Sequence, residues 1–214
     1  SVGTLWIGTD VGLNRYYPDT DGFISFRHDS ASPNSLSNNT VTAIVENSPG
    51  EYWIGTDDGG LNHFNQSTGQ FKRYQHNTNN PDSLSSNFIG SLYKDSKGTL
   101  WVGTGDSGLN RFNPQQQTFS RYQHNPADPG SLSANLVSDI VEDNQGVLWI
   151  GTDKGLNRLD LTKPVTKSSF THFKHKIGDS NSLSANDIER LFKDSNGTLW
   201  IGTREGLNQL KPNS

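Results

Sequence analysis

The sequence predicts an all-β protein, a β-propeller of four-stranded antiparallel blades with about five blade units. Three observations lead to this class. The five tryptophans recur every 47 to 51 residues in near-identical surroundings. Each period contains four short apolar runs separated by turn residues, as a four-stranded blade requires. No apolar run has the length or spacing of the helices of an α-solenoid, the rival architecture with a similar period.

Each blade is expected to start with its innermost strand, which residues 41–46 represent in the second unit. A four-residue turn follows, with Asp or Asn first and Gly fourth. The tryptophan strand comes next and turns through Thr-Asp-x-Gly into the third strand. The outermost strand carries two aromatic residues three apart, Phe23 and Phe26 in the first unit, so the two rings point to opposite faces. Both rings can be buried, because a blade has neighbours on both faces.

The repeat makes the whole chain a single propeller segment, with the following units: 1–40, 41–87, 88–135, 136–186 and 187–214. The first unit lacks an innermost strand and the last lacks an outermost strand, so both are partial. Methionine is absent even at position 1, which indicates a start inside a longer gene product. We expect either an arc of a larger propeller or half of a two-chain ring, since unpaired edges and uncovered faces favour self-association.

Composition excludes several classes of function. A net charge of -4 argues against a nucleic-acid partner, because such proteins are normally basic. No apolar run approaches the roughly 18 residues of a membrane span, so we expect no membrane contact by this segment itself. The absence of cysteine removes disulfides, thiolate zinc sites and cysteine nucleophiles. We predict neither a cofactor nor a metal.

Residues that recur once per blade are expected to serve the fold. Four histidines share one repeat position and would be spread around the ring, whereas metal ligands lie within about 2–2.5 Å of one ion. We expect these histidines to bond to loop backbone. Recurring aspartates likewise do not form the carboxylate pair of a glycosidase, and we predict that the chain is not an enzyme. The tryptophans are expected to be structural residues buried between blades: Trp6, Trp53, Trp101, Trp149 and Trp200.

Positions that break the repeat are better candidates for ligand binding. In a propeller the inner strand lines the channel, and charged residues accumulate there and in a neighbouring turn in the last two units. The candidate binding residues are Asp139, Asp187, Glu189, Arg190 and Arg204. An alternative remains open, in which Asp139, Glu189 and Arg190 neutralise one another across neighbouring blades.

The recurring phrase Trp-Ile/Val-Gly-Thr-x-x-Gly-Leu-Asn, with the Ser-Leu-Ser-x-Asn loop upstream, resembles the two-component regulator propeller repeat over essentially the whole chain. Members of that family are typically bacterial membrane sensors, hybrid histidine kinases or diguanylate cyclases, with large extracytoplasmic propellers. The resemblance implies a periplasmic, non-catalytic sensor module. We expect a small polar ligand, with a glycan fragment as one possibility. The alternatives are a propeller enzyme, such as a polysaccharide lyase or glycoside hydrolase, and a protein-interaction platform.

Overall fold

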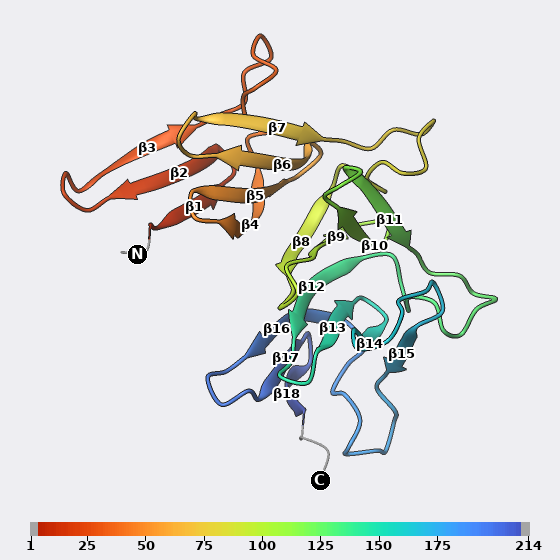
Figure 1. The fold of residues 1–214 in the computed structure, drawn as a ribbon. Coiled ribbons are helices and arrows are strands. Elements are labelled where there is room, and N and C mark those ends of the chain that lie inside the picture. Colours follow the sequence, from red (N-terminus) through yellow and green to blue (C-terminus); the bar gives the residue numbers. More distant parts are fainter. Residues whose placement is uncertain (1–3, 211–214) are drawn as a thin grey trace.

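Residues 4–210 are described by the computed structural model, and over that range the chain forms only strands and connecting loops (Figure 1). The strands build five antiparallel sheets, which confirms the predicted all-β propeller class. The first and last sheets have three strands and the other three have four. Within the described range, no helix has the length and hydropathy to cross a membrane.

The strands of each sheet pair in sequence order. They are β1 (Trp6–Thr9), β2 (Gly12–Tyr17) and β3 (Gly22–Phe26); β4 (Val41–Ser48), β5 (Glu51–Thr56), β6 (Gly60–Asn65) and β7 (Gln70–Tyr74); β8 (Ile89–Lys94), β9 (Leu100–Thr104), β10 (Leu109–Asn113) and β11 (Thr118–Tyr122); β12 (Val137–Glu142), β13 (Val147–Thr152), β14 (Gly155–Asp160) and β15 (Phe170–Phe173); and β16 (Ile188–Lys193), β17 (Leu199–Thr203) and β18 (Gly206–Leu210).

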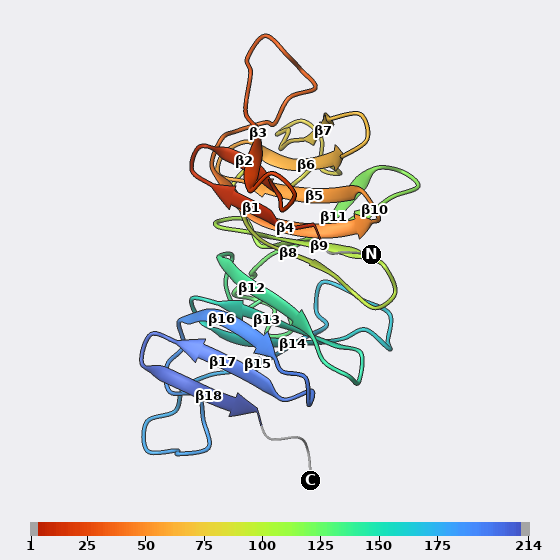
Figure 2. The same cartoon turned by 90° about the vertical axis from the view of Figure 1, so that its left-hand side faces the viewer.

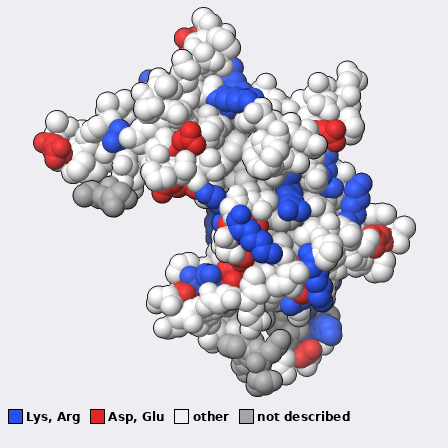
Figure 3. Space-filling model, in the orientation of Figure 1, with Lys and Arg blue, Asp and Glu red and all other residues white. Residues whose placement is uncertain are grey.

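The five sheets are stacked one after another as blades along an open arc (Figures 1 and 2). The inner strands β4, β8, β12 and β16 contact one another in that order and form the concave side. Figure 3 shows this side as a hollow between the two ends of the arc. Side chains of the inner strands that break the repeat are therefore placed beside this hollow.

The core lies between consecutive sheets and not inside any one of them. We call the face of a sheet that is turned toward the next sheet along the chain its forward face, and the opposite face its backward face. Four apolar clusters each combine the forward face of one sheet with the backward face of the next. Trp53, Trp101 and Trp149 are at most 4% exposed in these clusters. Trp6 and Trp200 are only half-buried, contrary to the expectation for all five. Within residues 4–210, no inner strand pairs with β1 beside Trp6, and Trp200 faces the uncovered side of the last sheet.

The loops that connect consecutive blades cover one end of each interface between blades. The leucine of each Ser-Leu-Ser loop is inserted into it, and Leu36, Leu84 and Leu132 are fully buried. The asparagine of the third strand holds this loop, as Asn62 shows: its Oδ1 accepts the Ser37 N–H at 3.0 Å and its Nδ2 donates to Ser37 Oγ at 2.8 Å. These bonds tie every loop to the following blade.

A buried aspartate fixes the turn before the tryptophan strand. The carboxylate of Asp95 accepts the backbone N–H groups of Lys97 and Thr99 and, at 2.9 Å, the indole N–H of Trp101. Asp143 and Asp194 make the same indole bond in the fourth and fifth sheets. The side chain therefore joins the turn to the core.

The second sheet departs from this pattern, which corrects the expectation of four equivalent turns. Asn47 occupies the aspartate position, and β4 continues to Ser48, which pairs with Glu51 across a two-residue connection. Within residues 4–210, the buried Nε1 of Trp53 has no hydrogen-bond partner. The second sheet thus has an amide where the other sheets have a carboxylate, a turn of different geometry, and a Trp53 indole N–H without a hydrogen-bond acceptor.

We expect Asp95→Ala to lower the free energy of unfolding by about 2–4 kcal/mol, because three donors lose a charge-assisted bond at a site that is 94% buried. Asn47→Ala is the matched control, and its cost should stay below about 1 kcal/mol because no indole bond is lost. Urea denaturation of both variants gives the comparison. Equal losses would contradict the assigned role of the carboxylate.

Candidate functional site

The structure brings three of the five candidate residues together at the last sheet. Asp187 precedes β16, Glu189 lies on β16, and Arg204 lies in the turn between β17 and β18. Arg204 Nε is 2.9 Å from Asp187 Oδ2 and 3.1 Å from Glu189 Oε1. Because the side chains of Arg204 and Glu189 are more than half exposed, these ion pairs contribute little to stability and can exchange for bonds to a ligand.

Asp139 lies on β12 and has a different role. Its carboxylate accepts the N–H of Ile140 at 2.9 Å and the N–H of Leu191, on the neighbouring sheet, at 2.8 Å. Burial raises the pKa of Asp139, while these two amides and the charge of Arg190 oppose the rise. Asp139 therefore bridges the inner strands of two blades and is already engaged by backbone.

Arg190 on β16 is exposed and directly follows Glu189 in the sequence. Its Nη1 donates to the carbonyl of Glu189 at 2.8 Å, and its charge acts on Asp139. The neutralisation considered from the sequence thus takes a different form, because the carboxylate of Glu189 is paired with Arg204 and not with Arg190. An exposed guanidinium can bind carboxylates or hydroxyl-rich molecules through several planar donors.

The recurring histidines take the structural role expected for them. In each of the four loops the histidine Nδ1 lies 2.6 to 2.8 Å from the carbonyl oxygen of the Ser-Leu-Ser leucine. The backbone N–H of the same histidine donates to an asparagine Oδ1 that precedes the next inner strand. Within residues 4–210, no group of three or more His, Asp or Glu side chains is arranged to hold a metal ion.

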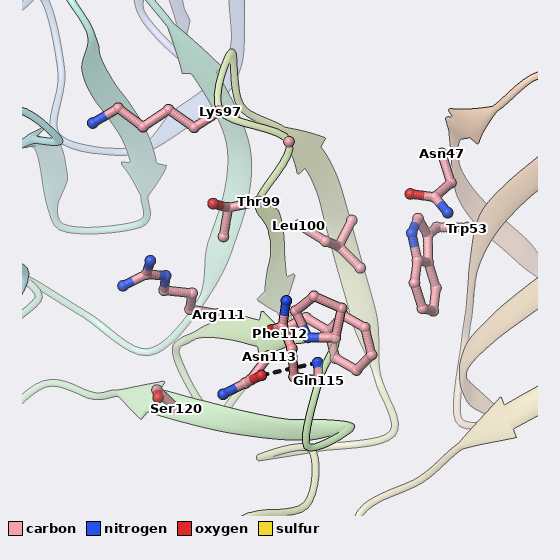
Figure 4. Close-up of a pocket in the computed structure, with 12 residues that line it drawn as sticks. Asn47, Trp53, Lys97, Thr99, Leu100, Arg111, Phe112, Asn113, Gln115 and Ser120 are labelled. Carbon is pink, nitrogen blue, oxygen red and sulfur yellow. Dashed lines mark hydrogen bonds between the residues drawn. The ribbon is translucent and has the colours of Figure 1, made fainter.

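A cavity of about 460 Å³ lies along the edge of the third sheet, on its boundary with the second sheet. Figure 4 shows Trp53 and Asn47 on one side of Leu100, with Lys97 and Arg111 extending on the other side. Both cations already have partners. Lys97 Nζ donates to the carbonyl of Leu161 at 2.6 Å, and the guanidinium of Arg111 lies 5.8 Å from the centre of the Trp101 ring.

Sequence reasoning missed this cavity because its cations occupy ordinary repeat positions. Two departures from the repeat around Trp53 mark this cavity in the sequence. Asn47 replaces aspartate, and His63 replaces the arginine of the first, third and fourth blades. The His63 ring lies 4.5 Å from the Trp53 ring. Burial lowers the pKa of His63, and Glu51 opposes this shift. The second blade thus departs from the repeat at two positions around Trp53.

Four segments of the chain match the family model described as two component regulator propeller: residues 35–58, 83–106, 131–154 and 182–205. No curated protein matches the sequence. Two solved structures from B. thetaiotaomicron are similar over 99% of this chain. One is the extracellular domain of a protein described as a hybrid two component system, with 29% identity and a TM-score of 0.81. The other is the extracellular domain of a protein described as a one component system, with 27% identity and a TM-score of 0.77.

The chain spans 27% and 26% of the lengths of those two chains. A third similar structure is PorZ, a surface component of the type-IX secretion system of Porphyromonas gingivalis. It has 20% identity and a TM-score of 0.67, and the alignment covers 97% of this chain and 30% of PorZ. At that identity the likeness concerns the fold alone.

Asp139 allows a pH test of the site. Because its pKa is raised, the folded state holds more protons than the unfolded state above the unfolded pKa, so stability falls as pH rises through the folded pKa. Asp139→Asn cannot ionise. We therefore expect the stability of wild type relative to this variant to decrease between pH 3.5 and pH 7 in urea denaturation. An increase over that range would mean that the two amides outweigh burial.

Proposed function

Because the chain carries four repeats of the two component regulator propeller family, we propose that it belongs to the periplasmic sensor region of a bacterial signal-transduction protein. Two similar structures support this proposal, since both are extracellular domains of proteins described as two component or one component systems. In this proposal the module binds the signal molecule, and another part of the signalling system carries out the reaction that follows. Its own role is therefore recognition.

The proposed ligand is a small polar molecule, and a glycan fragment fits the site best. The observation that carries this choice is the contrast between two kinds of polar residue. Recurring polar side chains are used in bonds between blades, whereas Arg190 and Glu189 on the inner strand β16 and Arg204 in the turn beside it are exposed. Hydroxyl groups of a sugar both donate and accept hydrogen bonds, so they suit a surface that presents guanidinium donors beside carboxylate acceptors.

A catalytic role has less support from the same geometry. A glycosidase places two carboxyl groups roughly 5–10 Å apart around the scissile bond, one of them free to transfer a proton. Asp187 and Glu189 instead share one guanidinium, and Asp139 is held by two backbone amides. An interaction platform for a protein partner would use the same exposed charges, and binding assays separate it from small-ligand recognition.

A thermal-shift screen of glycan fragments tests the proposed function. A ligand at 100 times its dissociation constant should stabilise the protein by about 2.7 kcal/mol. The sensor proposal expects the ligand to be recovered unchanged, whereas formation of a cleaved product would overturn it in favour of an enzyme. A screen of glycan fragments without any shift would remove the glycan assignment.

Arg190→Ala tests where the ligand binds. We expect this variant to lose at least ten-fold in affinity for the screened glycan, equivalent to about 1.4 kcal/mol. Its melting temperature without ligand should stay unchanged, because the side chain is exposed. Lys97→Ala, at the cavity of Figure 4, is the matched control and should bind normally. The reverse pattern would place the ligand in that cavity.

A further inference from the structure

The residue directly before the inner strand differs in each of the second to fifth sheets: Thr40, Phe88, Leu136 and Asp187. Phe88 is 42% exposed and Leu136 is 40% exposed. The third and fourth sheets are each packed between two neighbouring sheets, so this exposure does not come from an uncovered blade. Two large apolar side chains are thus exposed at a position where the repeat varies.

A glycine makes room for the ring of Phe88. A Cβ added to Gly105 would overlap Cε1 and Cδ1 of that ring and lie 2.9 Å from its Cζ. Gly105 does not have a positive φ, so the backbone conformation does not require glycine there. Three other sheets have a side chain at the same position of the turn: Asp57, Asp153 and Arg204. Phe88 and Gly105 therefore depart from the repeat together, and the second departure gives the ring its place.

Phe88 and Leu136 belong to neighbouring inner strands and lie at the same end of them. A Cβ on Gly90, in β8, would lie 2.9 Å from the carbonyl oxygen of Val137, in β12, and 3.9 Å from the backbone N of Gly105. The start of β12, directly after Leu136, thus adjoins the turn that Phe88 covers. Both strands contribute to the concave side of the arc (Figure 1). We call Phe88 and Leu136 the apolar pair.

The size of the apolar pair fits a small ligand. A stable protein interface buries roughly 800 Å² on each partner, which is far more than two side chains supply. Small-molecule sites combine apolar side chains with a few polar groups that fix the orientation of the ligand. The apolar pair therefore needs polar neighbours, and the adjoining turns supply them.

The turns between the second and third strands of the second, third and fourth sheets are acidic. Residues 57–59, 105–107 and 153–154 include four aspartates and one lysine: Asp57, Asp58, Asp106, Asp153 and Lys154. Three of these aspartates are exposed: Asp57, Asp58 and Asp106. Carboxylates accept hydrogen bonds from hydroxyl groups and repel anions. The surroundings of the apolar pair thus favour a hydroxylated ligand without negative charge.

We propose that one face of a sugar ring of a neutral glycan packs on the apolar pair, a proposal that rests on the glycan-sensor function proposed above. The face of an aromatic ring is negative, so it attracts the C–H groups that line one face of a sugar ring. Leu136 continues this surface onto the next blade. Hydroxyl groups at the edge of the sugar donate to the carboxylates of the turns, and acidic sugars are repelled by them.

Titration calorimetry with matched trisaccharides tests the class of ligand. The neutral probes are linear trisaccharides of glucose, mannose, galactose, xylose and N-acetylglucosamine, and the charged probes are the trimers of galacturonic acid and of glucosamine. We expect at least one neutral probe to bind, and the galacturonic acid trimer to bind at least about ten-fold more weakly than that probe. Tighter binding of the glucosamine trimer than of every neutral probe would assign the site to a cation and overturn the proposal.

Three variants test the apolar pair with the neutral probe that binds. Phe88→Ala should weaken binding at least about ten-fold, whereas Phe88→Tyr keeps an aromatic ring and should stay within about three-fold of the wild type. Gly105→Ala should weaken binding at least about three-fold although Phe88 is retained, because the added Cβ displaces the ring. Phe192→Ala is the matched control, since Phe192 is also exposed but lies on the last sheet, and it should bind as the wild type.

The outcomes separate this proposal from the proposed function. Unchanged binding in Phe88→Ala, together with a loss in Arg190→Ala, would overturn the apolar pair and leave the glycan sensor standing. Binding of the galacturonic acid trimer alone would do the same, whereas binding of no trimer would overturn both proposals. Thermal unfolding without ligand checks that each variant is folded, and Phe88→Ser replaces Phe88→Ala if that variant fails the check.

Discussion

The fold depends on one constraint, which is that each blade is apolar on both faces and has to be covered twice. A sheet with one apolar face can stand between core and solvent, but here the forward and backward faces both carry large side chains. Every apolar cluster accordingly draws on two consecutive sheets. The blades therefore stabilise one another in series, as expected for a repeat protein whose units contact mainly their neighbours.

Polar residues of the repeat follow from the same constraint. A loop that crosses from one blade to the next has backbone groups at the edge of an apolar interface, and these groups need partners. Arg73 meets this need by donating from Nε to the carbonyl of Ser35 at 3.0 Å and from Nη2 to that of Leu36 at 3.2 Å. Arg121 does the same one blade later, with Ser83 and Leu84. Side chains that recur are consequently committed, and only departures from the repeat remain available for recognition.

Most of the fold could be predicted from the tryptophan period, because a strand order repeated five times leaves few alternatives. Details that depend on single atoms could not. Asn47 differs from Asp95 only by an amide for a carboxylate, yet the two turns are built differently. The residues of the candidate site were predicted one by one, but the ion pairs between them were not. Arg204 reaches both Asp187 and Glu189 because the turn after β17 lies beside the start of β16, a proximity that only the folded sheet establishes.

Native-state hydrogen exchange on residues 1–214 tests the requirement for double coverage most directly. Backbone amides of β9 and β13, in blades covered on both faces, should be strongly protected. Amides of β2 and β17, in the first and last of the five blades, should be weakly protected, because each of these blades is covered on one face. Equal protection of all four strands would contradict the account, because the first and last blades would then be stable with one face uncovered.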